Sequence, residues 1–348
     1  TLAYMLWDTA YTLCDVPIFG IVTTMTLDQK ERVSLNSIGR IFAIFAGIVT
    51  GILLPLVRQS LGGWATTVIV LSILSAAMMI PMCLFAKERV IEREKARDGG
   101  AEENYTLRDM VECLRSNKYL LIFFAAPLIS SLLNVGATWG LYIARYCLGG
   151  EEIASFVSMA VIVPTLIGAA IAVQLCKKYD KFKIFYFSYM FALILGIVRY
   201  IAGYENMMVY VILNALGGFP LGIAAILQYQ FTPDCYEYGQ YKTGLKMRGV
   251  TFAAQTFFTK LNGAIATAVS VFALTLIGFK EGEGVIQAAG FADKLWTFSC
   301  LGSIIGGIGT LLILRLYKLN DHDVQLMSKC NNGEITREEA EAQMINRY

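Results

Sequence analysis

The sequence predicts an all-α integral membrane protein, built as a bundle of helices that cross a bilayer. The chain has 348 residues, of which 56% are apolar and only 16% are charged, whereas about 25% of the residues of a soluble domain are charged. Nine apolar segments each reach the roughly 20 residues that a helix needs to span hydrocarbon. None of them alternates apolar and polar residues as a membrane β-barrel does. These observations favour a helical bundle.

The nine segments account for most of the chain. The predicted membrane helices are 2–26, 38–57, 64–86, 119–146, 152–175, 183–203, 206–231, 249–278 and 294–317. Lys and Arg gather in alternate loops, namely the first, third, fifth and seventh, and such residues mark the cytoplasmic side. The tail 319–348 is therefore predicted to be cytoplasmic, in a multi-pass protein of the plasma membrane.

Composition also excludes several classes of function. The formal net charge is only +2, so no basic excess suggests nucleic acid. Eight cysteines are scattered without paired spacing, and the single histidine, His322, lies in the polar tail. These counts argue against zinc sites, histidine catalysis and an enzyme in general. We predict no metal site and no cofactor.

One charged loop, 87–118, divides the chain. Three spans precede it and six follow, and residues 106–114 within it are predicted to form an amphipathic surface helix. Secondary transporters of the major facilitator superfamily have two six-helix halves joined by such a loop, each half being an inverted pair of three-helix repeats. On this pattern 1–86 is the second part of an N-terminal half and 119–318 is the C-terminal half. Nine of twelve expected helices are then present, and the chain is expected to be truncated before the fourth.

The first span carries two carboxylates, Asp8 and Asp15. They lie seven residues apart, so they share about one helix face with Tyr11, Thr12 and Phe19. A charge at bilayer depth costs roughly 2.5 to 3.5 kcal/mol on insertion scales, so such a face points into a bundle interior or a wet cavity. The alternatives are that Asp8 lies near the interface and that Asp15 only pairs with a neighbouring helix.

A lysine lies deep in the eighth span. Lys260 is roughly 16 Å from the start of helix 249–278, too deep to reach the surface easily, and it needs a partner. Asp15 has the opposite charge at a similar depth, so we predict that the two face each other across a central cavity. A purely structural ion pair is the alternative.

Other polar residues of the spans have two readings each. Asn134, Gln228 and Asn262 either bind sugar hydroxyls or form interhelical hydrogen bonds. Arg199 is predicted to extend its side chain to the outer interface. The segment after 206–231 is predicted to be a cytoplasmic loop with a gate-side ion-pair network, formed by Asp234, Glu237 and Lys242.

Three stretches resemble the glycoside-pentoside-hexuronide cation symporters, the melibiose-permease type of the major facilitator superfamily. They are YTLCDVPIFGIVTTMTLDQKERVSLNSIGRIFAIFAG, PDCYEYGQYKTGLKMRG and AAQTFFTKLNGA. The resemblance implies that Asp15 binds sugar hydroxyls beside Tyr11, and that Thr12 lies close to the cation site. It implies further sugar contacts from Arg40 and Lys260, with Gln255 and Thr256 on the approach to that lysine. Phe19 stands where melibiose permease has a tryptophan that stacks on the sugar.

The function expected from this resemblance is secondary active transport. A sugar or glycoside would move together with Na+ or H+ by alternating access, with the bilayer as the only other partner. The acidic residues that bind the cation in the family belong to its second helix, which this chain is expected to lack. The alternatives are a transporter of the same fold for another solute, such as a nucleoside or a lysolipid, and, less favoured, an integral-membrane enzyme.

Overall fold

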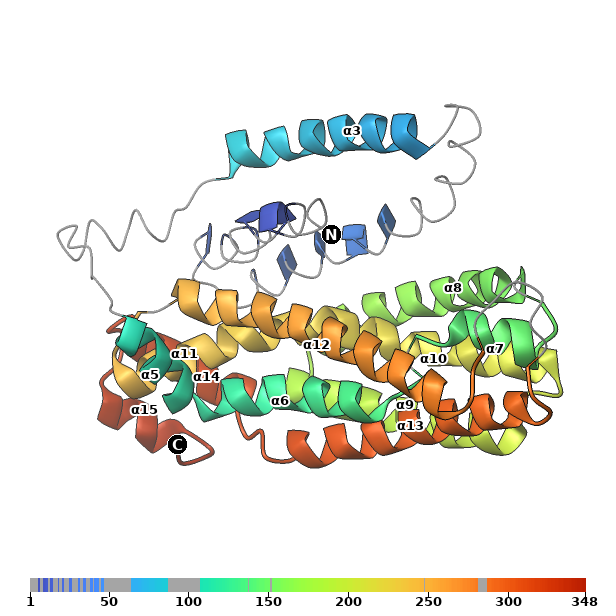
Figure 1. Ribbon diagram of the computed structural model, residues 1–348. Helices are drawn as coiled ribbons and strands as arrows, with labels where there is room; N and C mark the ends of the chain where they lie inside the picture. Colours follow the sequence, from blue (N-terminus) through green and yellow to red (C-terminus); the bar gives the residue numbers. More distant parts are fainter. Residues whose placement is uncertain are drawn as a thin grey trace. The chain divides into compact units, whose positions relative to one another are not determined.

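All regular elements that the computed structural model describes are helices (Figure 1). The described residues are 64–86, 107–136, 138–150, 152–246, 248–280 and 287–348, with scattered positions before residue 47. The helices are α3 (Trp64–Phe85), α5 (Leu107–Ser116), α6 (Lys118–Leu133), α7 (Gly140–Cys147), α8 (Glu152–Leu175), α9 (Lys181–Ala202), α10 (Met207–Leu227), the short 3-10 helix η1 (Gln228–Gln230), α11 (Phe231–Thr243), α12 (Arg248–Leu276), α13 (Phe291–Leu314), α14 (Asp321–Asn331) and α15 (Arg337–Gln343). The predicted all-α class is confirmed.

The chain falls into two compact units, Thr1–Asn104 and Tyr105–Tyr348. Their boundary lies inside the predicted dividing loop 87–118. In the first unit α3 confirms the predicted span 64–86, whereas spans 2–26 and 38–57 lie, apart from scattered positions, outside the described residues. In the second unit α5 confirms the amphipathic helix predicted at 106–114.

Among the described residues, five helices are long and apolar enough to cross a membrane. They are Phe156–Leu175, Lys181–Ala202, Met207–Thr243, Arg248–Leu276 and Phe291–Leu314. The end of α8 coincides with that of the predicted span 152–175, and α9, α12 and α13 match their predicted spans to within three residues. The seventh span differs, because the helical path of α10 continues through η1 and α11 to Thr243 where a loop was predicted.

The predicted single span 119–146 is wrong, because the chain breaks between α6 and α7. Asn134 ends α6, and its Oδ1 accepts a hydrogen bond from the Ser303 hydroxyl at 3.0 Å. Gly136 lies so close to α13 that a Cβ there would fall 2.5 Å from the Cα of Ser299. Trp139, at the start of α7, is fully buried and its indole N–H donates to the Ser270 carbonyl. Contacts with α12 and α13 therefore hold the break.

The long helices of the second unit pack in a pattern typical of an internal repeat. Helix α10 packs against α8 and α9, α13 against α6 and α9, and α12 against α6. Exchanging α6 with α10, α8 with α12 and α9 with α13 reproduces this pattern of contacts. The exchange turns the α6–α13 pair into α10–α9 and the α6–α12 pair into α10–α8. Two three-helix repeats packed against each other give this result, as in the repeats predicted from the sequence.

Helices α8 and α10 approach closely through glycines. A Cβ added at Gly222 would lie 2.0 Å from the Thr165 carbonyl oxygen, and one at Gly168 would lie 2.2 Å from the Phe219 carbonyl oxygen. Small residues let helix backbones approach in this way in membranes, where packing drives helix association. The backbones themselves thus form the interface.

We expect Gly222→Ala to destabilise the second unit, because the added methyl group meets backbone that cannot move aside. The loss should be on the order of 1 to 3 kcal/mol, measured as a lower unfolding midpoint in detergent. Gly217→Ala is the matched control on the same helix, since nothing lies within 4 Å of a Cβ there. Equal midpoints for the two variants would contradict the close packing.

Candidate functional site

The middle of α12 carries the predicted binding residues of the second unit. Gln255 and Thr256 are buried, and Lys260, twelve positions after the helix begins, is half-buried. The Gln255 Oε1 and Thr256 Oγ1 atoms are shielded and have no hydrogen-bond partner among the described residues. Buried polar atoms are nearly always paired, so two such acceptors within two turns of a lysine indicate a site for a hydroxyl-bearing or amine-bearing ligand.

A separate polar cavity lies within the second unit. It has a volume of about 170 Å³, and its polar lining comes from Ser130, Ser131, Tyr189, Gln228, Asn262 and Thr310. The Asn262 Oδ1 atom is buried without a hydrogen-bond partner among the described residues. Ligand sites usually measure roughly 300 to 1,000 Å³, so this cavity suits a few water molecules or part of a ligand.

The three neutral amides therefore differ in their surroundings. Gln228 and Asn262 line one cavity, whereas Asn134 forms the interhelical hydrogen bond with Ser303 that was its alternative reading. Asn262 is seven residues from Gln255, which places them on about one face of α12, while Lys260 lies one turn from Thr256 on another. The helix thus presents two polar faces.

The charged segment that was predicted as a loop is the helix α11, and most of its residues are buried. Its Asp234 forms an ion pair with Lys181 at 2.6 Å, and Lys181 also lies 3.2 Å from Asp321. Glu237 accepts a hydrogen bond from the Asn331 amide, whereas Lys242 is exposed. The predicted loop is therefore wrong, because this segment is a helix. A gating role for its charges stays a prediction.

Lys181 is the functional candidate that sequence reasoning missed. It follows Asp180, whose carboxylate accepts hydrogen bonds from the Phe182 and Lys183 amides and so caps α9. The lysines near the start of α9 served in the sequence analysis only as markers of the cytoplasmic side. The available sign was a lysine at the first position of an apolar helix, in a chain that also has an acidic segment. Such a lysine can be buried if it pairs with a carboxylate.

Most predicted site residues of the first unit lie outside the described residues. These are Asp8, Thr12, Asp15, Phe19 and Arg40. Tyr11 is described; it is helical and about half exposed, at 49%. Arg199 donates a hydrogen bond to Asn214 of α10 at 3.3 Å, and its predicted reach to the outer interface stays a prediction. The predicted Asp15–Lys260 pair stays a prediction.

Apolar helices of spanning length, a half-buried lysine and a polar interior cavity define a multi-pass membrane transport protein. The sequence model of the family described as "MFS/sugar transport protein" matches residues 1–321. The chain belongs to this family, whose members are transporters. The predicted superfamily and the choice of transporter over enzyme are thereby confirmed.

Several curated proteins resemble the chain at low identity. A putative glycoside/cation symporter, YagG of Escherichia coli K12, is 25% identical over 337 residues, which cover 94% of this chain and 71% of the relative. A lactose permease of Lactobacillus helveticus is 25% identical, with 91% and 48% covered. A putative sulfoquinovose importer of Escherichia coli K12 is 21% identical, with 98% and 74% covered. The chain thus spans about half to three quarters of these relatives' lengths.

Proposed function

We propose that this chain, within a protein of its family, carries a sugar or glycoside across the plasma membrane by alternating access, coupled to Na+ or H+. Its family and the printed functions of its relatives support this, since they include glycoside symport and lactose permeation. The basic loops support a cytoplasmic position for the tail 319–348. Asp15, Tyr11, Phe19 and Arg40 supply substrate contacts from the first unit in this proposal, and Thr12 lies by the cation.

The observation that carries the proposal is the group on α12. A sugar hydroxyl donates one hydrogen bond and accepts others. Gln255 Oε1 and Thr256 Oγ1 offer acceptors without partners among the described residues, and the Lys260 ammonium offers donors. A bound sugar would satisfy them with two hydroxyls, one that donates to Gln255 Oε1 and another that bonds the Thr256 hydroxyl. Each hydrogen bond donated by the charged ammonium would be roughly twice as strong as one between neutral groups.

The proposal is tested by uptake into vesicles that contain the protein in its natural length. Labelled glycosides, pentosides, nucleosides and lysolipids are supplied under a Na+ gradient, an H+ gradient or neither. We expect saturable uptake and counterflow of a glycoside or pentoside with one gradient only. Uptake of a nucleoside or a lysolipid, with none of any sugar, would overturn the sugar assignment while leaving the transporter class intact.

We expect Thr256→Val to weaken sugar binding without weakening the fold. Valine has nearly the shape of threonine, and replacing a buried hydroxyl that lacks a partner among the described residues removes a desolvation cost. The unfolding midpoint should therefore stay or rise, while the sugar Kd rises about tenfold, equivalent to roughly 1.4 kcal/mol. The control is Thr267→Val on the same helix, whose hydroxyl bonds the Gly263 carbonyl. A lower midpoint with unchanged Kd would mean that Thr256 is structural.

A further inference from the structure

The residues after α13 fold back onto one end of the helices of the second unit. The segment 318–348, here called the strap, contains α14, α15 and the last five residues, and it lies at the end where α6 and α9 begin (Figure 1). Its centre is Asp323, which is fully buried. A carboxylate without water needs many hydrogen-bond donors, and the strap itself provides them.

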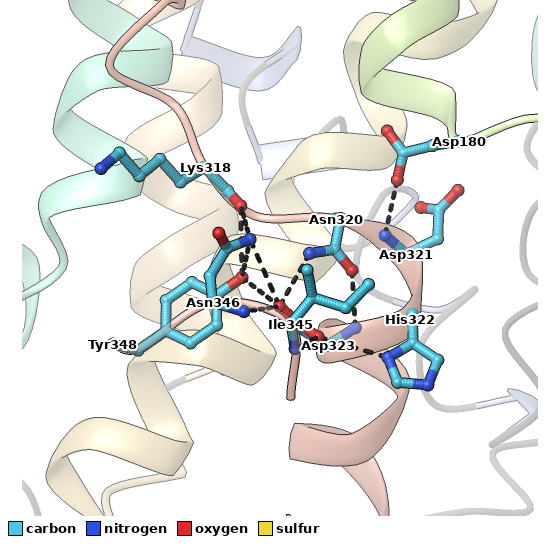
Figure 2. A network of polar contacts seen from close by, with 9 residues as sticks. All are labelled: Asp180, Lys318, Asn320, Asp321, His322, Asp323, Ile345, Asn346 and Tyr348. Carbon is cyan, nitrogen blue, oxygen red and sulfur yellow. Dashed lines mark hydrogen bonds and ion pairs between the residues drawn. The ribbon is translucent and has the colours of Figure 1, made fainter. Parts of the chain in front are cut away.

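Figure 2 shows how the strap closes on Asp323. The carboxylate accepts hydrogen bonds from the Ile345 amide at 2.8 Å, the Asn346 amide at 3.1 Å, the Tyr348 hydroxyl at 2.8 Å and the Asn320 side chain at 2.7 Å. Burial alone would raise the pKa of Asp323, but the donors outweigh it and hold the pKa below its ordinary value. Every one of these partners donates, so the position requires a group that only accepts.

A second set of contacts joins the strap to the start of α9. The Asp321 amide donates to the Asp180 carboxylate at 2.8 Å, and the Lys181 amide donates to the Asp321 carboxylate at 3.0 Å. The Lys181 ammonium then bridges Asp321 of the strap and Asp234 of α11. The first turns of α9 and of α11 are thus linked through the strap.

A third set joins the strap to α6 and to the far end of α11. The Tyr348 ring lies 5.8 Å from that of Tyr119, at the start of α6, and 6.0 Å from that of Tyr238, in α11. The Tyr241 hydroxyl of α11 donates to Glu341 at 3.0 Å, and Asn331 donates to Glu237. The strap therefore contacts three helices whose first residues lie 50 or more positions apart in the sequence.

We propose that the strap clamps the ends of α6, α9 and α11 into one rigid block, and that Asp323 is the anchor that keeps it closed. Alternating access rocks one helix bundle against another as a rigid body, so helix ends that are tied together transmit a movement that separate ends would absorb. The strap thus fixes one end of the moving unit. This inference goes beyond sugar transport, and its first readout does not depend on any substrate.

The test is amide hydrogen exchange of the full-length protein in lipid nanodiscs. Asp323→Asn keeps the shape of the side chain but turns an NH2 donor toward the donors around it. We expect exchange at least about tenfold faster in 337–348, and also faster in 181–185 and 231–243, because the three helices lose their common clamp. Unchanged exchange throughout overturns the anchor, and faster exchange confined to 321–348 overturns the clamp.

Two further variants complete the experiment. Tyr348→Phe removes one hydroxyl and keeps the ring, so it should accelerate exchange in the same regions to a smaller extent, and it remains informative if Asp323→Asn fails to fold. Ile345→Ala is the matched control, because Ile345 contributes its amide while its side chain is exposed. Exchange in Ile345→Ala as fast as in Tyr348→Phe overturns the role of the carboxylate bonds.

Discussion

Replacing Asp15 by asparagine is expected to abolish sugar binding while the protein still inserts into the membrane. The carboxylate is predicted to accept hydrogen bonds from neighbouring hydroxyls of the sugar, and an amide offers one acceptor oxygen in place of two. Isothermal titration of the purified variant measures binding, and its yield from the membrane fraction measures insertion. Binding within threefold of the unchanged protein would contradict the assignment.

The double variant Asp15→Asn with Lys260→Met separates two meanings of a lost activity. If the two residues form only a structural ion pair, either single change strands a charge, and removing both restores much of the function. If both contact the sugar, the double variant stays inactive. Lys280→Met, at an exposed lysine beyond the end of α12, is the control for a general effect of losing a positive charge.

Replacing Lys181 by methionine is expected to lower the free energy of unfolding by about 3 to 5 kcal/mol, the usual cost of removing one partner from a buried ion pair. Lys181 and Asp234 are both almost fully buried, at 4% exposed each. Methionine retains most of the apolar length of the side chain, so the loss reports on the stranded carboxylate rather than on a void. Unfolding in detergent by titration with a denaturing detergent measures the change.

Two companion variants control this result. Lys183→Met changes an exposed lysine on the same turn of α9 and should alter stability by less than about 0.5 kcal/mol. Lys181→Met combined with Asp234→Leu removes both charges and should recover more than half of the loss. A Lys181→Met variant as stable as Lys183→Met would show that the ion pair is not desolvated in the membrane-embedded protein.

The long helices could be predicted from sequence because hydropathy is a local property. The predicted end of span 152–175 coincides with the end of α8, since a continuous apolar run is bounded there by charged loops on both sides. The break at 134–139 could not be predicted in this way. Its causes are Ser270, Ser299 and Ser303, more than 130 residues away, and a window of apolar residues averages over the interruption.

The charged residues were harder to place because polarity alone does not distinguish a solvated loop from a buried network. The segment from Pro233 to Lys242 contains a proline, a glycine and several charges, which favoured a loop, yet Lys181 and Asn331 supply the partners that let it remain a buried helix. On α12 the reverse holds. Gln255, Thr256 and Lys260 stand out in an apolar run, so a sequence motif was enough to single them out, and their role in binding stays a prediction.

The break between α6 and α7 also bears on how the protein is made. At about 1.5 Å per residue, the 16 residues of α6 extend about 24 Å and the 8 of α7 about 12 Å, so neither crosses roughly 30 Å of hydrocarbon alone. The groups that satisfy the break, Ser270 and Ser303, are 131 and 169 residues further along the chain than their partners. At roughly 5 to 20 residues per second, the ribosome needs on the order of ten seconds to deliver them. The break between α6 and α7 therefore reaches its final packing only after α12 and α13 have been made.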